Sequence, residues 1–385
     1  MKVLIAPDSF KESLDAFRVT DALAKGLHEG TAETPEVYCR PLADGGDGLM
    51  QVLLNALGGT TITRTVTGPM GTPVKASLGL LDNGATAVVE MAAAAGLSLV
   101  SPAERNPLVA TTRGVGELIR HALDLKVRRI IVGLGGSATN DGGAGMAQAL
   151  GVSFLDRQGN SLPPGGAALQ DLFRVDCTQL DERLRSVEFI GACDVENRLC
   201  GDEGATVIYG PQKALPEESI LPLDAALHHY GVIVGEEMGA DLLSIAGGGA
   251  AGGLGAGLVA FTGATLRSGI SLVFDAYGDM EECAQEADII FSGEGAVDGQ
   301  TLQGKVVAGV AALASRHKKP LLVFAGRVRG SLEALYSAGV TAVLPIAPGP
   351  ISAEESMQNA AHYLSAAAKN IGRLFDAMKG RSVHD

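Results

Sequence analysis

The chain has 385 residues, of which 52 are glycine and only 4% are aromatic. Glycine is about twice as common as its usual share of roughly 7%, yet with 46% hydrophobic residues the composition excludes both a disordered chain and collagen. Thirty basic residues against 44 acidic ones give a net charge of −14, which argues against partners such as nucleic acid or an anionic membrane. The length predicts two or three domains with substantial buried cores.

The five cysteines are an odd number and lack close pairing, so a complete disulfide framework is excluded. A reducing compartment follows, and we expect a cytoplasmic protein. The first nine residues, MKVLIAPDS, contain too short an apolar run for a secretory signal and predict a first strand.

Short apolar runs predict strands at residues 3–6, 130–132, 189–192, 205–208, 289–291, 321–324 and 342–344. Apolar residues at helical spacing predict helices over 19–27, with Gly30 as the stop, and over 115–123, capped by Thr111 or Thr112. Further helices are predicted at about 304–316 and 330–338. The alternation of strands and helices is typical of a parallel α/β sheet.

We therefore predict the α/β class with two α/β domains. Residues 1–70 and 275–385 would share one Rossmann-like parallel sheet, because neither segment has enough strands to form a covered domain alone. Residues 71–274 would form the inserted domain.

Residues 242–266 contain no charge and are long enough to cross a membrane, but eight of them are glycine. Each glycine costs roughly 1 kcal/mol relative to alanine inside a helix. A glycine-rich loop that enters a buried helix is favoured, and a transmembrane helix with GxxxG spacing is the minor alternative.

The segment 130–151, IIVGLGGSATNDGGAGMAQALG, joins a strand to a helix through a glycine-rich loop. Such a loop suits anion binding, because backbone N–H groups can approach oxygen closely at a helix N-terminus. The candidate cofactor ligands are Gly135, Gly136, Ser137, Thr139, Asn140 and Asp141. Neither the Walker A pattern nor the dinucleotide fingerprint fits, and a tight structural connection is the alternative.

A second glycine-rich segment, residues 246–257, has no polar side chain, so a ligand would be held by backbone groups such as those of Gly248 and Gly249. Close helix packing is an equally weighted alternative for it. A third segment, residues 293–305, follows a predicted strand with Asp298 and Lys305, and polar residues at a strand end are typical of a ligand site.

Other predicted strands are also followed by polar residues. They are Asp8, Ser9 and Lys11 in PDSFKES, Asp44 in PLADGGDG, and Asp194 in CDVEN. Asp194 is a candidate metal ligand or base, whereas Asp–Gly–Gly–Asp alone is ordinary turn chemistry.

Together, PDSFKES, PLADGGDG, TTRGVGEL, GLGGSATNDGGAG, CDVEN, GPQK, GGGAAGGLGAG and GEGAVDGQTLQGK resemble the bacterial glycerate kinase family, of the type called glycerate kinase I. The resemblance covers nearly the whole chain. It implies phosphorylation of D-glycerate by ATP with Mg²⁺, on two α/β domains around a cleft, and favours 2-phosphoglycerate as the product. Arg198 and Ala214 depart from the family pattern and put only local loop geometry in doubt.

On this resemblance, Gly135, Gly136, Ser137 and Thr139 would hold phosphate, while Asp194 or Asp298 would bind Mg²⁺ or accept the hydroxyl proton. Lys11 and Arg113 would bind the glycerate carboxylate, and Lys305 would neutralise phosphate. An exposed helix residue is the alternative for Arg113, and a solvated loop cation is the alternative for Lys11.

Two other functions remain as alternatives. One is a kinase for another small hydroxy acid or sugar, because GLGGSAT loosely resembles the loop of GHMP kinases. The other is a non-catalytic sensor of a nucleotide or metabolite. The sequence leaves open whether the chain forms a homo-oligomer.

Overall fold

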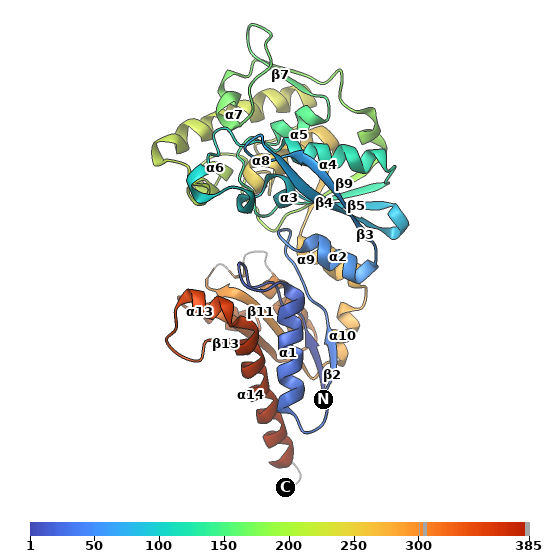
Figure 1. Ribbon diagram of the computed structural model, residues 1–385, viewed down its shortest axis with the longest axis vertical. Coiled ribbons are helices and arrows are strands. Elements are labelled where there is room, and N and C mark those ends of the chain that lie inside the picture. Colours follow the sequence, from blue (N-terminus) through green and yellow to red (C-terminus); the bar gives the residue numbers. More distant parts are fainter. Residues whose placement is uncertain (300, 303–305, 382–385) are drawn as a thin grey trace. The chain divides into compact units, whose positions relative to one another are not determined.

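The computed structural model describes residues 1–299, 301–302 and 306–381, and its fold belongs to the mixed α/β class, as predicted (Figure 1). The chain forms two compact units: unit 1 is Met1–Asp44 with Ile270–Asp385, and unit 2 is Gly45–Gly269. The chain therefore passes from one unit to the other at residues 44/45 and 269/270, whereas the predicted boundaries were near 70 and 275. Residues 45–70 belong to unit 2 because β3 (Thr60–Thr67) forms an antiparallel pair with β4 (Pro73–Leu81).

Unit 1 is built on a parallel sheet of five strands in the order β13-β12-β11-β1-β2. The strands are β1 (Lys2–Ile5), β2 (Glu36–Cys39), β11 (Ile289–Val297), β12 (Leu321–Val328) and β13 (Ala342–Pro345). Val3 of β1 pairs with Val37 on one side and with Ile289 on the other. The interior of β1 is a continuous apolar run because helices cover both faces of such a sheet.

The helices of unit 1 are α1 (Ala16–Gly30), α9 (Gly269–Tyr277), α10 (Met280–Glu286), α11 (Val306–Arg316), α12 (Glu333–Ser337), α13 (Ala353–Gln358) and α14 (Ala360–Arg381). Helix α1 begins after Asp15, whose carboxylate accepts the N–H of Arg18 at 2.8 Å. Gly30 was predicted to follow the helix as its stop, but it is the last helical residue, and a side chain there would collide with the main chain of Lys369. The glycine therefore permits the close contact of α1 with α14 (Figure 1).

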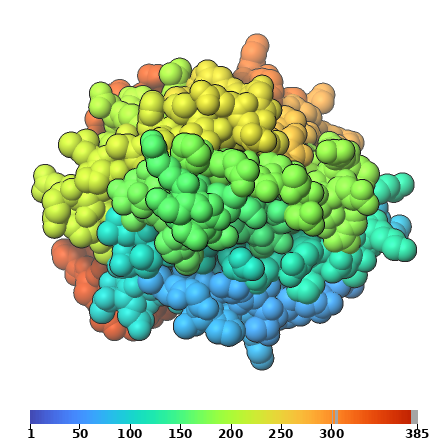
Figure 2. Space-filling model, turned by 90° about the horizontal axis from the view of Figure 1, so that it is seen from above, coloured from blue at the N-terminus to red at the C-terminus, as the bar shows by residue number. Residues whose placement is uncertain are grey.

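Unit 2 contains a mixed sheet of six strands in the order β10-β9-β6-β5-β4-β3. Its other strands are β5 (Thr86–Glu90), β6 (Arg129–Gly133), β9 (Glu188–Ala192) and β10 (Thr265–Arg267), which run parallel to one another. β7 (Ser153–Leu155) and β8 (Arg174–Asp176) form a separate antiparallel pair. In Figure 2 the green segment that contains this pair lies on the surface of the unit.

The helices of unit 2 are α2 (Leu49–Leu57), α3 (Met91–Ala95), α4 (Arg113–Asp124), α5 (Ala144–Ala149), α6 (Ala205–Tyr209), α7 (Glu217–Met238) and α8 (Ala250–Thr262). The strand predicted at residues 205–208 is wrong, because this segment is α6, which packs against α7 and α8. Tertiary contacts thus override the β propensity of its Val and Ile residues.

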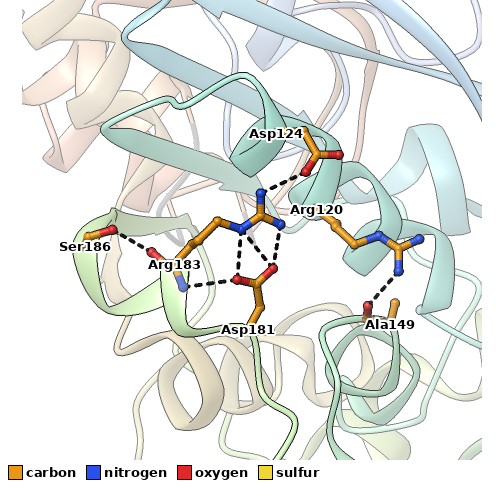
Figure 3. A network of polar contacts seen from close by, with 6 residues as sticks. All are labelled: Arg120, Asp124, Ala149, Asp181, Arg183 and Ser186. Atoms are coloured by element: carbon orange, nitrogen blue, oxygen red, sulfur yellow. Dashed lines mark hydrogen bonds and ion pairs between the residues drawn. The ribbon is translucent and has the colours of Figure 1, made fainter.

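The C-terminal end of α4 is tied to the segment before β9 by an exposed polar network (Figure 3). The guanidinium of Arg183 donates one hydrogen bond to Asp124 at 2.8 Å and another, from a second nitrogen, to Asp181 at 2.7 Å. Arg120 of the same helix reaches the carbonyl oxygen of Ala149 at 3.5 Å, at the end of α5. These bonds fix the C-terminal ends of α4 and α5.

Helix α8 is almost entirely buried, and three successive residues near its start, Ala251, Gly252 and Gly253, have positive φ. The interruption agrees with the predicted glycine-rich loop that enters a buried helix. Among the residues that the structure describes, no helix is both long and apolar enough to span a membrane.

Candidate active site

Three carboxylates of unit 1 interact electrostatically near the carboxyl ends of its central strands. Asp8 follows β1, Glu294 lies in β11, and Asp44 ends the first segment of the unit. The backbone N–H of Asp8 donates to the carbonyl oxygen of Gly293 at 2.9 Å, which fixes the loop after β1 against β11. This edge of a parallel sheet is where ligands of α/β proteins usually bind.

Asp8 is the most perturbed of these groups, with only 6% of its surface exposed. Burial raises the pKa of Asp8 to about 8, and the negative charges of Asp44 and Glu294 act in the same direction. The N–H of Ser9, which donates to the Asp8 carboxylate at 2.6 Å, and the cation of Lys11 oppose the rise in pKa. Asp8 can therefore exchange a proton near neutral pH.

Glu294 is linked by a hydroxyl to the predicted metal ligand Asp298. Thr301 donates its hydroxyl to Glu294 at 2.6 Å and accepts the backbone N–H of Asp298 at 3.0 Å. The loop after β11 is thus held to the carboxylate cluster. Lys305, the predicted phosphate-neutralising residue, lies outside the described residues.

In unit 2 the loop after β6 is held against the segment after α3 by an antiparallel bridge between Ser137 and Gly96. Leu97 donates its N–H to the carbonyl oxygen of Gly136 at 2.8 Å, and Ala138 donates to Ala95 at 2.9 Å. Because these bonds flank Ser137, its own N–H points away from the bridge. Gly136 is exposed, so the Gly136–Ser137 turn is the part of the loop that a ligand can reach.

Three later residues of this loop are fully buried: Thr139, Asn140 and Asp141. The Asp141 carboxylate accepts both the N–H and the hydroxyl of Thr112, at 2.8 and 2.9 Å, and the N–H of Gly143 at 3.1 Å. All three were predicted to contact a cofactor, and the structure places them on the buried underside of the loop. Of the two predicted caps of α4, Thr112 directly precedes the helix but bonds through its hydroxyl to Asp141, whereas the hydroxyl of Thr111 accepts the N–H of Arg113 at 3.2 Å.

The second glycine-rich segment packs against the first. Gly248 donates its N–H to Ile245 at 3.0 Å and Gly249 donates to Asn197 at 2.9 Å, so neither N–H is directed at a ligand. The carbonyl oxygen of Gly252 accepts the N–H of Gly142 at 3.0 Å. Of the two interpretations of this segment, the geometry favours close packing.

Asp194, which follows β9, is held by three donors. One carboxylate oxygen accepts the hydroxyl of Ser268 at 2.8 Å and the N–H of Gly269 at 3.0 Å, and the other accepts the N–H of Gly45. Gly45 and Gly269 are the first and last residues of unit 2. The Asp194 carboxylate therefore binds the backbone at both ends of this unit.

The two predicted carboxylate-binding cations belong to different units. Lys11 is exposed in unit 1 and acts electrostatically on Asp8. Arg113 lies in the first turn of α4 in unit 2, is half exposed, and pairs with Glu117 at 3.4 Å. The ion pair of Arg113 with Glu117 is the contact expected of an exposed helix residue, which was the alternative role for Arg113.

Sequence reasoning missed Glu90, which ends β5 in unit 2. Its carboxylate accepts the N–H of Met50 at 3.0 Å, at the start of α2, and burial raises its pKa. Asp47 contributes to this rise and lies beside Gly136 of the glycine-rich loop. The position of Glu90 directly after an apolar run could have identified it, by the same rule that identified Asp8.

Within the described residues, no three His, Cys, Asp or Glu side chains lie close enough to form a ready-made metal site. Mg²⁺ does not require one, because it is usually held by one or two carboxylates and by substrate phosphates.

Comparison with known proteins identifies the family of the chain. The model of the glycerate kinase family matches residues 3–376. The glycerate kinase of Bacillus subtilis (strain 168) is 44% identical, and the match covers 96% of this chain and 97% of that protein. The glycerate 2-kinase of Escherichia coli (strain K12) is 43% identical, with the same coverage of each chain.

A crystal structure described as a candidate glycerate kinase 2, from Salmonella typhimurium LT2, superimposes with a TM-score of 0.83 at 44% identity and covers 99% of each chain. The chain therefore belongs to the glycerate kinase family and is a kinase, a phosphotransferase with an alcohol group as acceptor.

Proposed function

We propose that this enzyme transfers the γ-phosphoryl group of ATP to D-glycerate and releases 2-phosphoglycerate and ADP. The observation that carries the proposal is the buried Asp8 in its carboxylate cluster, in a chain that matches glycerate kinases along its whole length. The 2-position of the product is taken from the name of the Escherichia coli relative.

The Gly136–Ser137 turn is our choice for the phosphate site. The N–H of Ser137 points away from the bridge to Gly96, and the neighbouring Gly136 is exposed. Asp47 lies beside this turn, and its carboxylate would repel a bare phosphate. Phosphate bound together with a cation suits this environment.

Mg²⁺ is that cation in our proposal, and when bound it neutralises phosphate charge during the transfer. Asp298 and Asp194 were the expected ligands. Since three donors already occupy the Asp194 carboxylate, we choose Asp47, which lies beside the proposed phosphate turn of unit 2, as a Mg²⁺ ligand, and Asp298 of unit 1 is a separate candidate. Asp194 then acts by anchoring the ends of unit 2.

Glycerate is assigned to the carboxylate edge of unit 1. Asp8 can accept the proton of the attacking hydroxyl, because its raised pKa lies close to neutral pH. Ser9 and Lys11 follow it in the same loop, where Lys11 can pair with the glycerate carboxylate. Arg113 remains a second candidate for that carboxylate, on condition that it leaves Glu117.

The test is incubation of the purified protein with ATP, Mg²⁺ and D-glycerate, followed by phosphorus NMR. We expect ADP and 2-phosphoglycerate, no product when Mg²⁺ is chelated, and slower reaction with L-glycerate. A product phosphorylated at the 3-position would overturn the regiochemistry alone.

The same assay tests the alternatives. Faster turnover of another hydroxy acid or a sugar would indicate a different acceptor, and binding without turnover would indicate a sensor. We also propose a cytoplasmic location, which the five unpaired cysteines support.

A further inference from the structure

A lysine that no predicted role accounts for lies beneath the glycine-rich loop of unit 2. Lys213 ends the 3-10 turn Pro211–Lys213, and only 1% of its surface is exposed. Its ammonium nitrogen lies 2.7 Å from the carbonyl oxygen of Thr139 and donates a hydrogen bond to it. Burial of an ammonium group costs several kcal/mol unless other groups compensate, so such a lysine needs a physical explanation.

Asp141 supplies the opposite charge. Its carboxylate is fully buried in the same loop and raises the pKa of Lys213 electrostatically, whereas burial lowers that pKa to about 7. Either protonation state of the amine can donate to Thr139, so the hydrogen bond does not depend on the charge.

The underside of the loop also contains unpaired polar atoms and a second donor from below. The side-chain oxygens of Thr139 and Asn140 are buried without a hydrogen-bond partner among the described residues. Tyr230 of α7 donates its hydroxyl to the carbonyl oxygen of Gly142 at 2.9 Å. Lys213 and Tyr230 thus both donate hydrogen bonds from buried side chains to carbonyl groups of the loop, whereas Asp141 accepts N–H groups of the loop. The carbonyl group that Lys213 holds is the closer of the two to the exposed turn along the chain, because Thr139 lies only two residues after Ser137.

We propose that Lys213 is a positioning residue for phosphoryl transfer, which fixes the Gly136–Ser137 turn by holding the carbonyl group of Thr139 from the buried side. This inference rests on the proposed role of that turn in binding the phosphates of ATP. Loss of the bond would leave a third unpaired acceptor in the buried part of the loop and would free the main chain next to the turn.

The test compares Lys213→Met, which keeps the length of the side chain but removes the donor, with Tyr230→Phe. Tyr230→Phe removes one hydrogen bond to the same loop without a change of charge. That bond is made to Gly142, three residues after Thr139. For Lys213→Met we expect the KM for ATP to rise about tenfold and the KM for glycerate to stay within about twofold. For Tyr230→Phe we expect both constants to change by less than about threefold.

Hydrogen exchange of the loop amides gives a readout that does not involve nucleotide. We expect faster exchange in the peptide that covers residues 134–142 of Lys213→Met than in wild type, with little change elsewhere in the chain. If Lys213→Met does not fold, Lys213→Gln, which retains a donor, replaces it, with a smaller rise in the KM for ATP expected.

The outcomes separate the two proposals. An unchanged KM for ATP in a folded variant, or equal effects of the Lys213 and Tyr230 substitutions, would overturn the positioning role and leave the proposed function intact. If wild type does not use ATP at all, the proposed function fails. Unchanged exchange in the loop would then refute the support by Lys213 independently.

Discussion

The carboxyl ends of the parallel strands carry different chemistry in the two units. In unit 1 they carry titratable side chains, with Asp8 buried beside other carboxylates. In unit 2 the loop after β6 consists mainly of glycine and main chain, braced from below by Asp141 and Lys213. One region depends on the charge of side chains and the other on the shape of the backbone. Substitutions should therefore affect the rate most in unit 1 and the stability most in unit 2.

The largest effect is expected for Asp8→Asn, because the amide cannot accept the hydroxyl proton. We expect kcat to fall by about 10²–10⁴-fold, with the fold retained. The measurement is steady-state kinetics with glycerate and ATP. Asp15→Asn makes the same chemical change on an exposed carboxylate of unit 1 and should leave kcat unchanged. Equal rates for the two variants would remove Asp8 from the reaction.

Gly252→Ala should be the most destabilising change in unit 2. Gly252 has a φ of +68°, and an added methyl group would also collide with the main chain of Thr139. We expect the free energy of unfolding to fall by about 3 kcal/mol in denaturant titrations. Gly263 has the same φ with open space around it, so Gly263→Ala isolates the backbone strain of about 1 kcal/mol. Similar losses for both variants would mean that close packing of the two glycine-rich segments contributes little.

Asp194→Asn tests whether this carboxylate anchors or reacts. The side-chain NH₂ group of asparagine would face a group that now donates to the Asp194 carboxylate, and two donors cannot form a hydrogen bond. We therefore expect the free energy of unfolding to fall by about 2 kcal/mol. Ser268→Ala removes one of these bonds and should lower it by about 1 kcal/mol. A collapse of kcat in Asp194→Asn without loss of stability would instead support the predicted role of Asp194 as a metal ligand or base.

The dependence of stability on pH should have opposite signs in the two units. The pKa of Asp8 is raised by folding, so its stabilising contribution is complete below the unfolded value near 3.8 and is lost as the pH rises towards 8. Wild type should therefore lose stability relative to Asp8→Asn across this window, by at most about 1.4 kcal/mol per pH unit. Denaturant midpoints measured every half pH unit check the slope, and a difference that does not vary with pH would contradict it.

Lys213 should give the reverse trend. Folding lowers its pKa from 10.5 to about 7, so the unfolded chain binds more protons between these values and wild type gains stability as the pH rises. Lys213→Met should show a weaker gain over this window, with Tyr230→Phe as the control that keeps it. Asp141 shares the buried site, and its raised pKa acts in the opposite direction at lower pH. Parallel curves for wild type and Lys213→Met would show that the amine does not titrate there.

Much of the fold could be predicted because its signals are local. The strand at residues 289–291, the helix stripe of α4 and the origin of the first sheet in both ends of the chain all follow from apolar periodicity and alternation. The strand predicted at residues 205–208 was wrong because a short apolar run does not distinguish a strand from a helix. The boundary between the units was predicted near residue 70, but the chain enters unit 2 at Gly45. No change of composition marks Gly45, and the pairing of β3 with β4, which assigns residues 60–67 to unit 2, is a tertiary feature.

The candidate site divides in the same way. The sequence by itself determined which loops carry the polar and glycine residues, because these residues stand directly after apolar strands. Only the tertiary structure decided which face of each loop is exposed. It buried Thr139, Asn140 and Asp141, turned the Asp194 carboxylate towards Gly45, and placed Lys213 under a loop more than seventy residues earlier in the chain. Burial and hydrogen bonding between distant segments depend on packing, and local sequence does not encode that packing.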